Sequence, residues 1–306
     1  MPAKRLICIG GATLDRVFFL DAMPARGTKV RSRDYLEVGG GQAANAAVAA
    51  ARLSGTVALW SAVGDDAAGA IILAQLAAEH VDTTGVSIVA GARSLTAAVL
   101  VDASGERTIV SDLDPCLRAA TRRPDLSAVT ACQAILADVK WSALARPALE
   151  EARRMGIPVV LDIEPAPMEQ LTELCPLADH AIFSRSGLVA YTGSNDPDQG
   201  LAIAFARIGR VVGVTLGAEG VRLLSSAGQV RVPAPRVEVA DTTGAGDAFH
   251  GAYALAIAEG CTAVAAAQFA NAVAAMKCTR RGGRLGLPTR AEVEVFIREQ
   301  PAVPAR

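Results

Sequence analysis

The stretch "VADTTGAGDAFHGAYALAIAEG", residues 239–260, joins the end of an extended segment to a glycine-containing turn and an alanine-rich helix. Gly244, Ala245 and Gly246 directly precede a helix that is predicted to begin near Asp247. The first N–H groups of a helix have no acceptor within it and carry the positive end of the helix dipole, so such a turn attracts an anion, usually a phosphate. Asp247 has two interpretations: a cap of the helix, or a general base beside a bound phosphate.

The hydrophobic pattern of the rest of the chain predicts alternating strands and helices. The predicted strands are 5–11, 56–64, 133–139, 157–163, 179–184 and 211–217, and the helical patterns between them are 43–53, 66–79, 142–155, 168–175 and 199–208. Continuously apolar strands separated by helices indicate an α/β fold with a mostly parallel sheet covered on both faces. Ligands of such sheets bind at the carboxyl ends of the strands.

Two segments, about 16–38 and 94–112, break this alternation. The second is predicted to form two strands joined by the turn Ala103-Ser104-Gly105-Glu106. Together the two segments predict a small antiparallel sheet inserted into one domain that spans residues 1–306. An inserted sheet beside the strand ends would serve as a lid, or equally as a dimer surface.

Composition excludes several classes of protein. The 306 residues include 30 basic and 31 acidic side chains, which argues against a nucleic-acid surface or a membrane as a partner. The six cysteines form no CxxC pair and the three histidines have no ligand spacing, so we expect a reducing, cytoplasmic location and no zinc site. The apolar stretch near the N-terminus ends at Asp15 and Arg16, which favours a buried strand over a signal peptide. The alanine-rich segment 262–278 carries polar residues and is predicted to be a core helix.

A second glycine-rich stretch, "GGGQAANAAVAAARL" at 39–53, satisfies the GxGxxA pattern of dinucleotide-binding proteins. The segment before it is charged and no acidic residue follows at the expected distance, so the context argues against an NAD site. The glycines would let the backbone approach a ligand, and Asn45 would offer both a donor and an acceptor to a hydroxylated one. A plain glycine turn explains these residues equally well. Because the chain has no GxxxxGK[ST] motif, residues 244–246 are the best candidate for binding phosphate.

"GGGQAANAAVAAARL" (39–53) and "DTTGAGDAFHGA" (241–252) together resemble the two signatures of the ribokinase-type (phosphofructokinase-B) carbohydrate and nucleoside kinases. The resemblance extends over essentially the whole chain. It implies a ribokinase-like three-layer α/β/α fold with a mostly parallel central sheet and a small inserted β-sheet lid. It also implies an ATP-dependent and Mg²⁺-dependent kinase that transfers the γ-phosphoryl group to a primary hydroxyl of a small sugar or sugar derivative.

The resemblance assigns roles at the reacting end of the site. Asp247 would take the proton from the sugar hydroxyl, and the N–H groups of Gly244, Ala245 and Gly246 would hold the transferring phosphoryl group. Sugar contacts are implied for Asp15, Gly40, Gly41 and Asn45. His250, three residues after Asp247, is expected to be a packing residue.

The resemblance also assigns the nucleotide and cation sites. Thr215 and Gly217 would line the nucleotide, and Asn271 would lie at the adenine pocket. The backbone carbonyls of Asp241 and Thr243 would bind a monovalent cation such as K⁺. Many members of the family carry an Asn-x-x-Glu motif in the magnesium and phosphate shell, whereas this chain has Ser184-Arg185-Ser186-Gly187. The protein ligands of Mg²⁺ are therefore left unassigned, although Mg²⁺ commonly keeps several waters.

Four stretches, among them "ILADVKW" and "KCTRRGGRLGLP", are most similar to family members that phosphorylate 6-deoxy-6-sulfofructose. Those enzymes grip the sulfonate with a lysine, an arginine and an asparagine; here the matching residues are Lys29, Lys140 and Ser111. Arginine to lysine is not neutral, because a bidentate fork becomes a point charge. Asp112 and Asp114 stand nearby and would repel an anion if they faced it. The acceptor is thus a sulfosugar, a related ketose, or a different sugar.

Two further functions stay open. A nucleoside kinase would need a larger aromatic pocket, and only 4% of the chain is aromatic, although Phe18, Phe19 and Tyr35 lie in the lid segment. The missing Asn-x-x-Glu carboxylate would also suit a sugar or nucleotide sensor that has lost catalysis. The expected partners are a sugar, ATP and, through the lid, a second copy of the chain.

Overall fold

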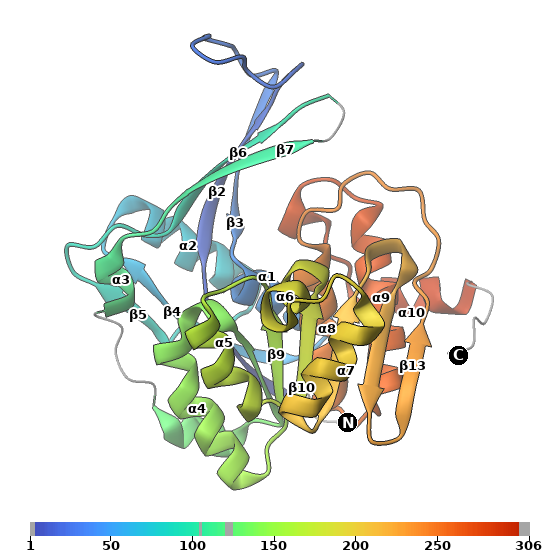
Figure 1. Cartoon of the computed structure of the whole chain (residues 1–306). Helices are drawn as coiled ribbons and strands as arrows, with labels where there is room; N and C mark the ends of the chain where they lie inside the picture. Colours follow the sequence, from blue (N-terminus) through green and yellow to red (C-terminus); the bar gives the residue numbers. More distant parts are fainter. Residues whose placement is uncertain (1–3, 104–105, 120–124, 300–306) are drawn as a thin grey trace.

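The computed structural model describes residues 4–103, 106–119 and 125–299, and it contains two sheets (Figure 1). The larger one has nine strands in the order β13-β12-β11-β10-β9-β8-β1-β4-β5. Its strands are β1 (Arg5–Ile9), β4 (Thr56–Gly64), β5 (Val86–Val89), β8 (Ala134–Asp138), β9 (Val159–Ile163), β10 (His180–Ser184), β11 (Val211–Thr215), β12 (Val221–Ser225) and β13 (Gly228–Val232). All neighbours from β11 to β5 are parallel, and β12 and β13 add an antiparallel edge.

Helices cover both faces of this sheet and make the expected three layers. Strand β1 shows why: Leu6 and Cys8 face one hydrophobic core, whereas Ile7 and Ile9 face the other. The first core is closed by α1 (Gln42–Arg52), α2 (Ala67–Ala78), α8 (Ala245–Ala258), α9 (Ala263–Cys278) and α10 (Arg290–Glu299). The second is closed by α3 (Pro115–Ala119), α4 (Ser142–Met155), α5 (Met168–Leu174), α6 (Arg185–Thr192) and α7 (Pro197–Ile208). Short 3₁₀ turns are η1 (Leu126–Ala131), η2 (Val139–Trp141), η3 (Cys175–Leu177), η4 (Gly217–Glu219) and η5 (Gly283–Gly286).

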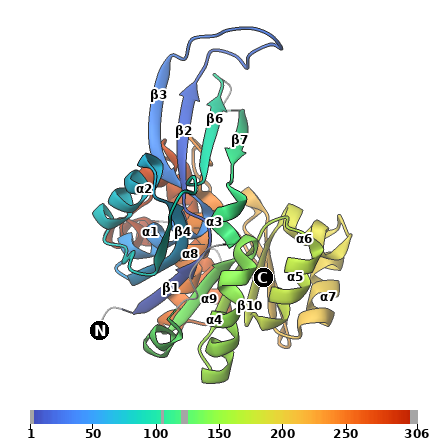
Figure 2. The ribbon, with the colours of Figure 1, turned by 90° about the vertical axis from the view of Figure 1, so that its left-hand side faces the viewer.

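The second sheet, called the small sheet below, stands apart from the large one (Figure 2). It consists of β2 (Thr13–Phe19), β3 (Asp34–Gly40), β6 (Thr96–Val101) and β7 (Arg107–Asp112), in the order β3-β2-β6-β7. The expectation of an antiparallel sheet is wrong for the central pair, because β2 and β6 are parallel. Each begins a hairpin that leaves the same edge of the large sheet, β2 after β1 and β6 after β5, so the two strands run in the same direction. Ser104 and Gly105 of the predicted turn lie outside the described residues.

The six predicted strands and five predicted helices are all present, with ends that differ by up to two residues. The core helix expected at 262–278 is α9, and it is buried against α8. Among the described helices, none combines the length and the apolar character needed to cross a membrane.

Close packing of α1 on α8 positions the two signature segments. Gly251 of α8 lies against the backbone of Ala46 in α1, and a Cβ at Gly251 would overlap the Ala46 carbonyl oxygen. Only glycine permits this approach. The contact brings the N-terminal ends of both helices together and places Asn45 next to Asp247.

Candidate active site

The N-terminus of α8 provides donors for an anion. Gly244 precedes the helix with a φ of 76°, and the first hydrogen bond of the helical ladder runs from Ala248 N–H to the Gly244 carbonyl. The N–H groups of Gly246 and Asp247 therefore have no acceptor within the helix. A Cβ at Gly246 would meet nothing within 4 Å, so the space in front of this turn is open. The N–H of Ala245 donates to the Thr242 carbonyl at 3.2 Å and is used by the turn itself.

The carboxylate of Asp247 lies beside these donors and is held by Asn45. Asn45 Nδ2 donates to Asp247 Oδ2 at 2.7 Å. Burial raises the pKa of Asp247 to about 7, the negative charge of Asp162 adds to this effect, and the Asn45 hydrogen bond opposes it. A carboxyl group that titrates near neutral pH is well suited to accept a proton.

Arg284, a residue that the sequence did not indicate, fixes Asn45 from the other side. Its side chain is buried; Nε donates to Asn45 Oδ1 at 2.9 Å and Nη2 donates to the Gly40 carbonyl at 2.9 Å. Because an arginine has only donors, the Asn45 amide must turn its oxygen to Arg284 and its NH₂ group to Asp247. The three residues form one chain of hydrogen bonds from η5 to α8.

The predicted sugar-binding residues Asp15, Gly40 and Asn45 meet at this chain. A Cβ at Gly40 would overlap the Asp15 carboxylate, so that carboxylate lies directly against the glycine turn. Burial raises the pKa of Asp15 to about 6, while the charge of Arg284 lowers it. Gly41 has a φ of 90°, and a Cβ there would overlap the Gly11 carbonyl oxygen. Both facts explain why the third residue of Gly39-Gly40-Gly41 is a glycine.

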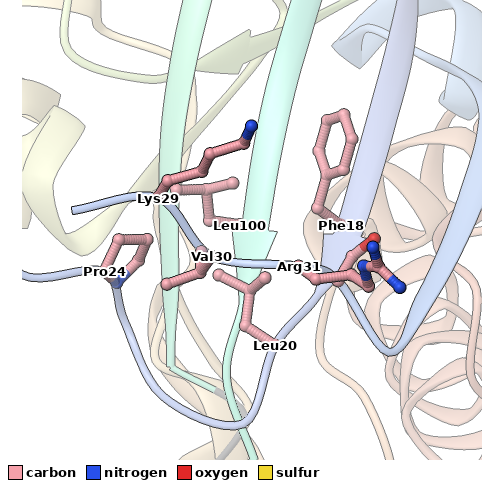
Figure 3. Close-up of a pocket in the computed structure, with 8 residues that line it drawn as sticks. Phe18, Leu20, Pro24, Lys29, Val30, Arg31 and Leu100 are labelled. Carbon is pink, nitrogen blue, oxygen red and sulfur yellow. The ribbon is translucent and has the colours of Figure 1, made fainter.

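The three residues predicted to grip a sulfonate are spread over the site and the small sheet. Ser111 pairs with Ala97, which pairs with Asp15, so Ser111 lies two strands from Asp15 at the same level. Lys140 follows β8, and its N–H donates to Asp138 Oδ1 at 3.0 Å. Lys29 lies in the loop between β2 and β3, where it lines a pocket of ≈ 640 Å³ with Phe18, Leu20, Pro24, Val30, Arg31, Ser32 and Leu100 (Figure 3).

That pocket lies at the far end of the small sheet, around the last residues of β2 and β6, and not at Asp247. From Asp15 to Phe19 alone, β2 extends by four residues, or about 13 Å. Within one chain, Lys29 therefore lies apart from Ser111 and Lys140, and the three residues do not form one cluster. The sulfonate-binding role of the three residues stays a prediction.

The residues predicted to line the nucleotide lie at the carboxyl edge of the large sheet, where Thr215 ends β11 and Gly217 begins η4. Thr215 Oγ1 donates to the Phe183 carbonyl at 3.4 Å, and Gly217 has a φ of 60° with open space where a side chain would be. Asn271 in α9 donates through Nδ2 to the carbonyls of Val232 at 2.9 Å and Pro233 at 3.2 Å. These bonds hold the backbone after β13, and contact of Asn271 with an adenine stays a prediction.

The turn that carries Asp241 and Thr243 is already in contact with a positively charged side chain of the protein, that of Lys277. Asp241 Oδ1 accepts the Thr243 N–H at 2.8 Å. Lys277 Nζ donates to the Asp241 carbonyl oxygen at 2.8 Å, the atom that was predicted to bind K⁺. Burial alone would raise the pKa of Asp241, but the Thr243 hydrogen bonds and the charge of Lys277 outweigh it and hold the pKa at about 2.

Three acidic residues at the strand ends were not predicted: Asp138, Asp162 and Glu164. Asp138 Oδ2 accepts the Gly11 N–H at 2.7 Å. Asp162 Oδ2 accepts from Gln42 Nε2 at 3.3 Å, and burial, with the charge of Glu164, raises its pKa well above the ordinary value. The rule that ligands bind at the carboxyl ends of parallel strands could have found all three, since each ends or follows a predicted strand.

Glu164 supplies a carboxylate next to Ser184, the first residue of the stretch that replaces the Asn-x-x-Glu motif. Ser184 Oγ donates to Glu164 Oε2 at 3.0 Å and also accepts the N–H of Gly187 at 3.0 Å. A Cβ at Gly187 would overlap the Ile163 carbonyl oxygen, so no side chain fits at that position. The carboxylate next to Ser184 thus comes from Glu164, directly after β9, and position 187 of α6 has none.

His250 is a buried packing residue of α8, as expected. Its Nδ1 lies 2.8 Å from the Gly246 carbonyl oxygen and 3.5 Å from Asp162 Oδ1. A further contact joins the small sheet to the α8 turn, because Arg107 Nη1 of β7 donates to Thr243 Oγ1 at 3.0 Å.

Comparison with known proteins agrees with this geometry. The model of the pfkB family of carbohydrate kinases matches residues 3–290. A ribokinase of Bacillus subtilis is 33% identical over 96% of this chain and 99% of its own length, and a fructokinase-1 of Oryza sativa is 30% identical over 85% and 88%. A crystal structure of a candidate ribokinase from Agrobacterium tumefaciens superimposes with a TM-score of 0.94, at 37% identity and with 97% and 98% of the two chains covered.

The chain therefore belongs to the pfkB family of carbohydrate kinases. Within that family it is a sugar kinase of the type that includes ribokinases, fructokinases and deoxyribokinases.

The substitution Arg284→Met tests the hydrogen-bond chain. It keeps an aliphatic side chain but removes the donors to Asn45 and Gly40, so the Asn45 amide is free to turn away from Asp247. Hydrogen bonds to charged groups contribute roughly 1.5–3 kcal/mol, and we expect kcat of the kinase reaction to fall about 10-fold to 100-fold. Arg154→Met, at an exposed position of α4, is the control and should keep wild-type kcat. A folded Arg284→Met enzyme with unchanged kcat would contradict the role of this chain.

Proposed function

We propose that this enzyme transfers the γ-phosphoryl group of ATP to a primary hydroxyl of a small sugar, with Asp247 as the general base. One observation carries the proposal: a carboxylate with a raised pKa lies in the first turn of α8, next to N–H groups that have no acceptor within the helix and to open space beside Gly246. A hydroxyl in that space would contact Asp247 on one side and a phosphoryl group on the other. In-line phosphoryl transfer requires this arrangement.

The reaction then needs few groups from the protein. Asp247 takes the proton of the sugar hydroxyl while the hydroxyl oxygen forms its bond to the γ-phosphorus. The bond between that phosphorus and the β,γ-bridging oxygen breaks, and its electron pair leaves with ADP. The N–H groups of Gly244, Gly246 and Asp247 hold the negative oxygens of the transferring group, and their contribution is mainly electrostatic.

The small sheet would act as the lid of a single kinase domain that spans residues 1–306. Asp15 lies on β2 and Ser111 on β7, so a sugar held by Asp15 would lie under this sheet. The Arg107–Thr243 hydrogen bond supports closure onto the α8 turn. A lid excludes water, which would otherwise compete with the sugar for the phosphoryl group.

ATP and Mg²⁺ complete the proposal. An Arabidopsis thaliana ribokinase has been solved with ribose and ATP, and an Escherichia coli candidate ribokinase II with ATP and Mg²⁺. Mg²⁺ prefers carboxylate oxygens and keeps several waters, and the half-buried Glu164 carboxylate beside Ser184 fits this preference. When bound, the ion would neutralise charge on the ATP phosphates; Glu164 would hold it through its water shell.

The identity of the sugar rests on fewer observations. The relatives are named for ribose, fructose and deoxyribose. Repulsion of an anion by Asp112 and Asp114 is reduced, because Arg93 Nε lies 3.1 Å from Asp112 Oδ2 and the Arg93 N–H donates to Asp114 Oδ2 at 3.0 Å. A sulfonated ketose such as 6-deoxy-6-sulfofructose, gripped by Lys140 and Ser111, therefore stays within the proposal alongside related neutral ketoses.

A homodimer formed through the small sheet also belongs to the proposal, as does a cytoplasmic location. Ile109 and Val110 of β7 are 55% and 65% exposed, and Tyr35 of β3 is 48% exposed. A second copy that covers these side chains would remove apolar surface from water. The molar mass in solution measures this association.

The substitution Asp247→Asn tests the function directly. The acceptor panel is D-ribose, 2-deoxy-D-ribose, D-fructose, 6-deoxy-6-sulfofructose and adenosine, and the readout is ADP release that depends on the acceptor. We expect the wild type to phosphorylate one of the sugars, and the variant to lose about 10²–10⁴-fold in kcat with that sugar. The control is Asp196→Asn, because asparagine also caps helix α7 at that position.

Folding of the Asp247→Asn variant is checked by thermal unfolding. The folded pKa of Asp247 is raised, so its ionisation costs stability as the pH rises through about 7. At about pH 8 the variant should then unfold at no lower temperature than the wild type. Near wild-type turnover of the variant would exclude Asp247 as the base. A wild type that binds a sugar but releases no ADP would favour the sensor.

The pH dependence of the wild type reports the same carboxylate. The base must be ionised, and the pKa of Asp247 is about 7, so kcat/KM is expected to fall as the pH decreases through that value. Well below it, the decline should approach about tenfold per pH unit, since kcat/KM follows the free enzyme. Initial rates with the preferred sugar measure the profile. A flat profile down to about pH 5 would contradict an Asp247 pKa near neutrality.

The role of Glu164 is tested by Glu164→Gln, which keeps the size and removes the charge. We expect the Mg²⁺ concentration for half-maximal rate to rise about 10-fold or more, since losing an outer-shell partner weakens metal binding by this order. Binding of Mn²⁺ to the protein–ATP complex, followed by electron paramagnetic resonance, should weaken in parallel. Glu169→Gln, at an exposed position of α5, is the matched control. Unchanged Mn²⁺ affinity in Glu164→Gln would refute the assignment.

A further inference from the structure

Lys277, near the end of α9, has a side chain with no exposed surface. Its ammonium group lies among three oxygen atoms: the carbonyl of Asp241 at 2.8 Å, the carbonyl of Arg280 at 3.3 Å and Asp241 Oδ2 at 3.4 Å. A buried ammonium is unfavourable unless it is paired and hydrogen-bonded. These three oxygens meet that requirement.

The same oxygens belong to the segment that shapes the anion-binding turn. Asp241 begins the "DTTGAGD" stretch, and its Oδ1 holds the Thr243 N–H. Its Oδ2 accepts from the N–H groups of Gly282 at 3.0 Å and Gly283 at 3.2 Å, directly before Arg284. One positive charge at Lys277 therefore stabilises a carboxylate that ties the α8 turn to the segment carrying Arg284.

Carbonyl and carboxylate oxygens are also the atoms that bind a hard metal cation. The expected K⁺ would take the Asp241 carbonyl oxygen, which here already accepts from Lys277. A K⁺ on that oxygen would lie beside the positive charge of Lys277 and be repelled by it, so the residues present do not fit a bound K⁺ at this position.

We infer that the ammonium group of Lys277 takes the place of a monovalent cation, and that this enzyme needs no K⁺. The inference rests on the proposed kinase function. It assigns Lys277 as a positioning residue, because its charge acts on the reacting groups through Asp241 and the turn.

The experiment uses the full-length wild type and Lys277→Met, which keeps a long apolar side chain and removes the charge. Each is assayed in KCl, NaCl and tetramethylammonium chloride at one ionic strength, by ADP release with the sugar that the acceptor panel identifies. Thermal unfolding of the apo proteins is measured in the same salts. Lys4→Met is the control, since Lys4 precedes β1 and lies outside the site.

We expect wild-type kcat to change by less than about twofold between salts, whereas Lys277→Met should lose at least about tenfold in tetramethylammonium and recover in KCl. KCl should also raise the unfolding temperature of apo Lys277→Met above that in tetramethylammonium, and leave the wild type unchanged. This unfolding measurement needs no sugar, so it stays informative even if the kinase assignment fails.

Three results would overturn the inference. Several-fold activation of the wild type by K⁺ would show that a cation binds elsewhere, and this measurement stands even if the variant does not fold. Full activity of Lys277→Met without K⁺ would show that the charge has no role. A folded variant that is inactive and gains neither activity nor stability in KCl would show that no cation can replace the ammonium.

Discussion

The amide of Asn45 is the point on which the site depends. Its NH₂ group binds Asp247 and its oxygen binds Arg284, and these partners are 202 and 239 residues away in the chain. An amide has one oxygen and one NH₂ group, so satisfying Arg284 leaves only one orientation toward Asp247. The packing of Gly251 on Ala46 sets the distance between the two helices, and the Arg284 bond sets the rotation of the amide.

Negatively charged side chains gather near the Asn45 amide, and because they are buried, water screens their charge poorly. Asp138 and Asp162 are buried at the ends of β8 and β9, and Asp247 lies close enough to Asp162 for its pKa to rise. Such a cluster reduces stability, because each ionised carboxylate is disfavoured by burial and by its neighbours. The cationic group of Arg284 offsets part of this cost at Asp247, and that of Lys140 does so at Asp138 and Asp162. Lys277 stabilises the neighbouring carboxylate of Asp241, so residues 277–284 matter to a site whose recognisable motifs lie elsewhere.

Local pattern was sufficient for the large sheet, because its strands are continuously apolar and its helices long. It was insufficient for the parallel pairing of β2 with β6: a turn signal marks the hairpin of β6 and β7, but only the common edge from which both hairpins leave sets the relative direction of β2 and β6. The signature stretches predicted Asp247, Asn45 and the glycines. Arg284 and Lys277 carry no such signal, since an isolated charged residue acquires its role from neighbours distant in sequence. Glu164 is marked only by its place directly after a predicted strand. Lys277 looks like an ordinary cation in the last turn of a helix, and only the fold shows the oxygens around it.

The glycine at position 187 limits how this sequence can change. A single substitution that restores glutamate there would drive its Cβ into the Ile163 carbonyl, and so would any other side chain. Either α6 or the end of β9 would have to move to admit the side chain, and Glu164 directly follows Ile163 at this point of contact. Substitution at position 187 is consequently epistatic with the backbone at Ile163, because a larger residue becomes acceptable only after that contact is relieved.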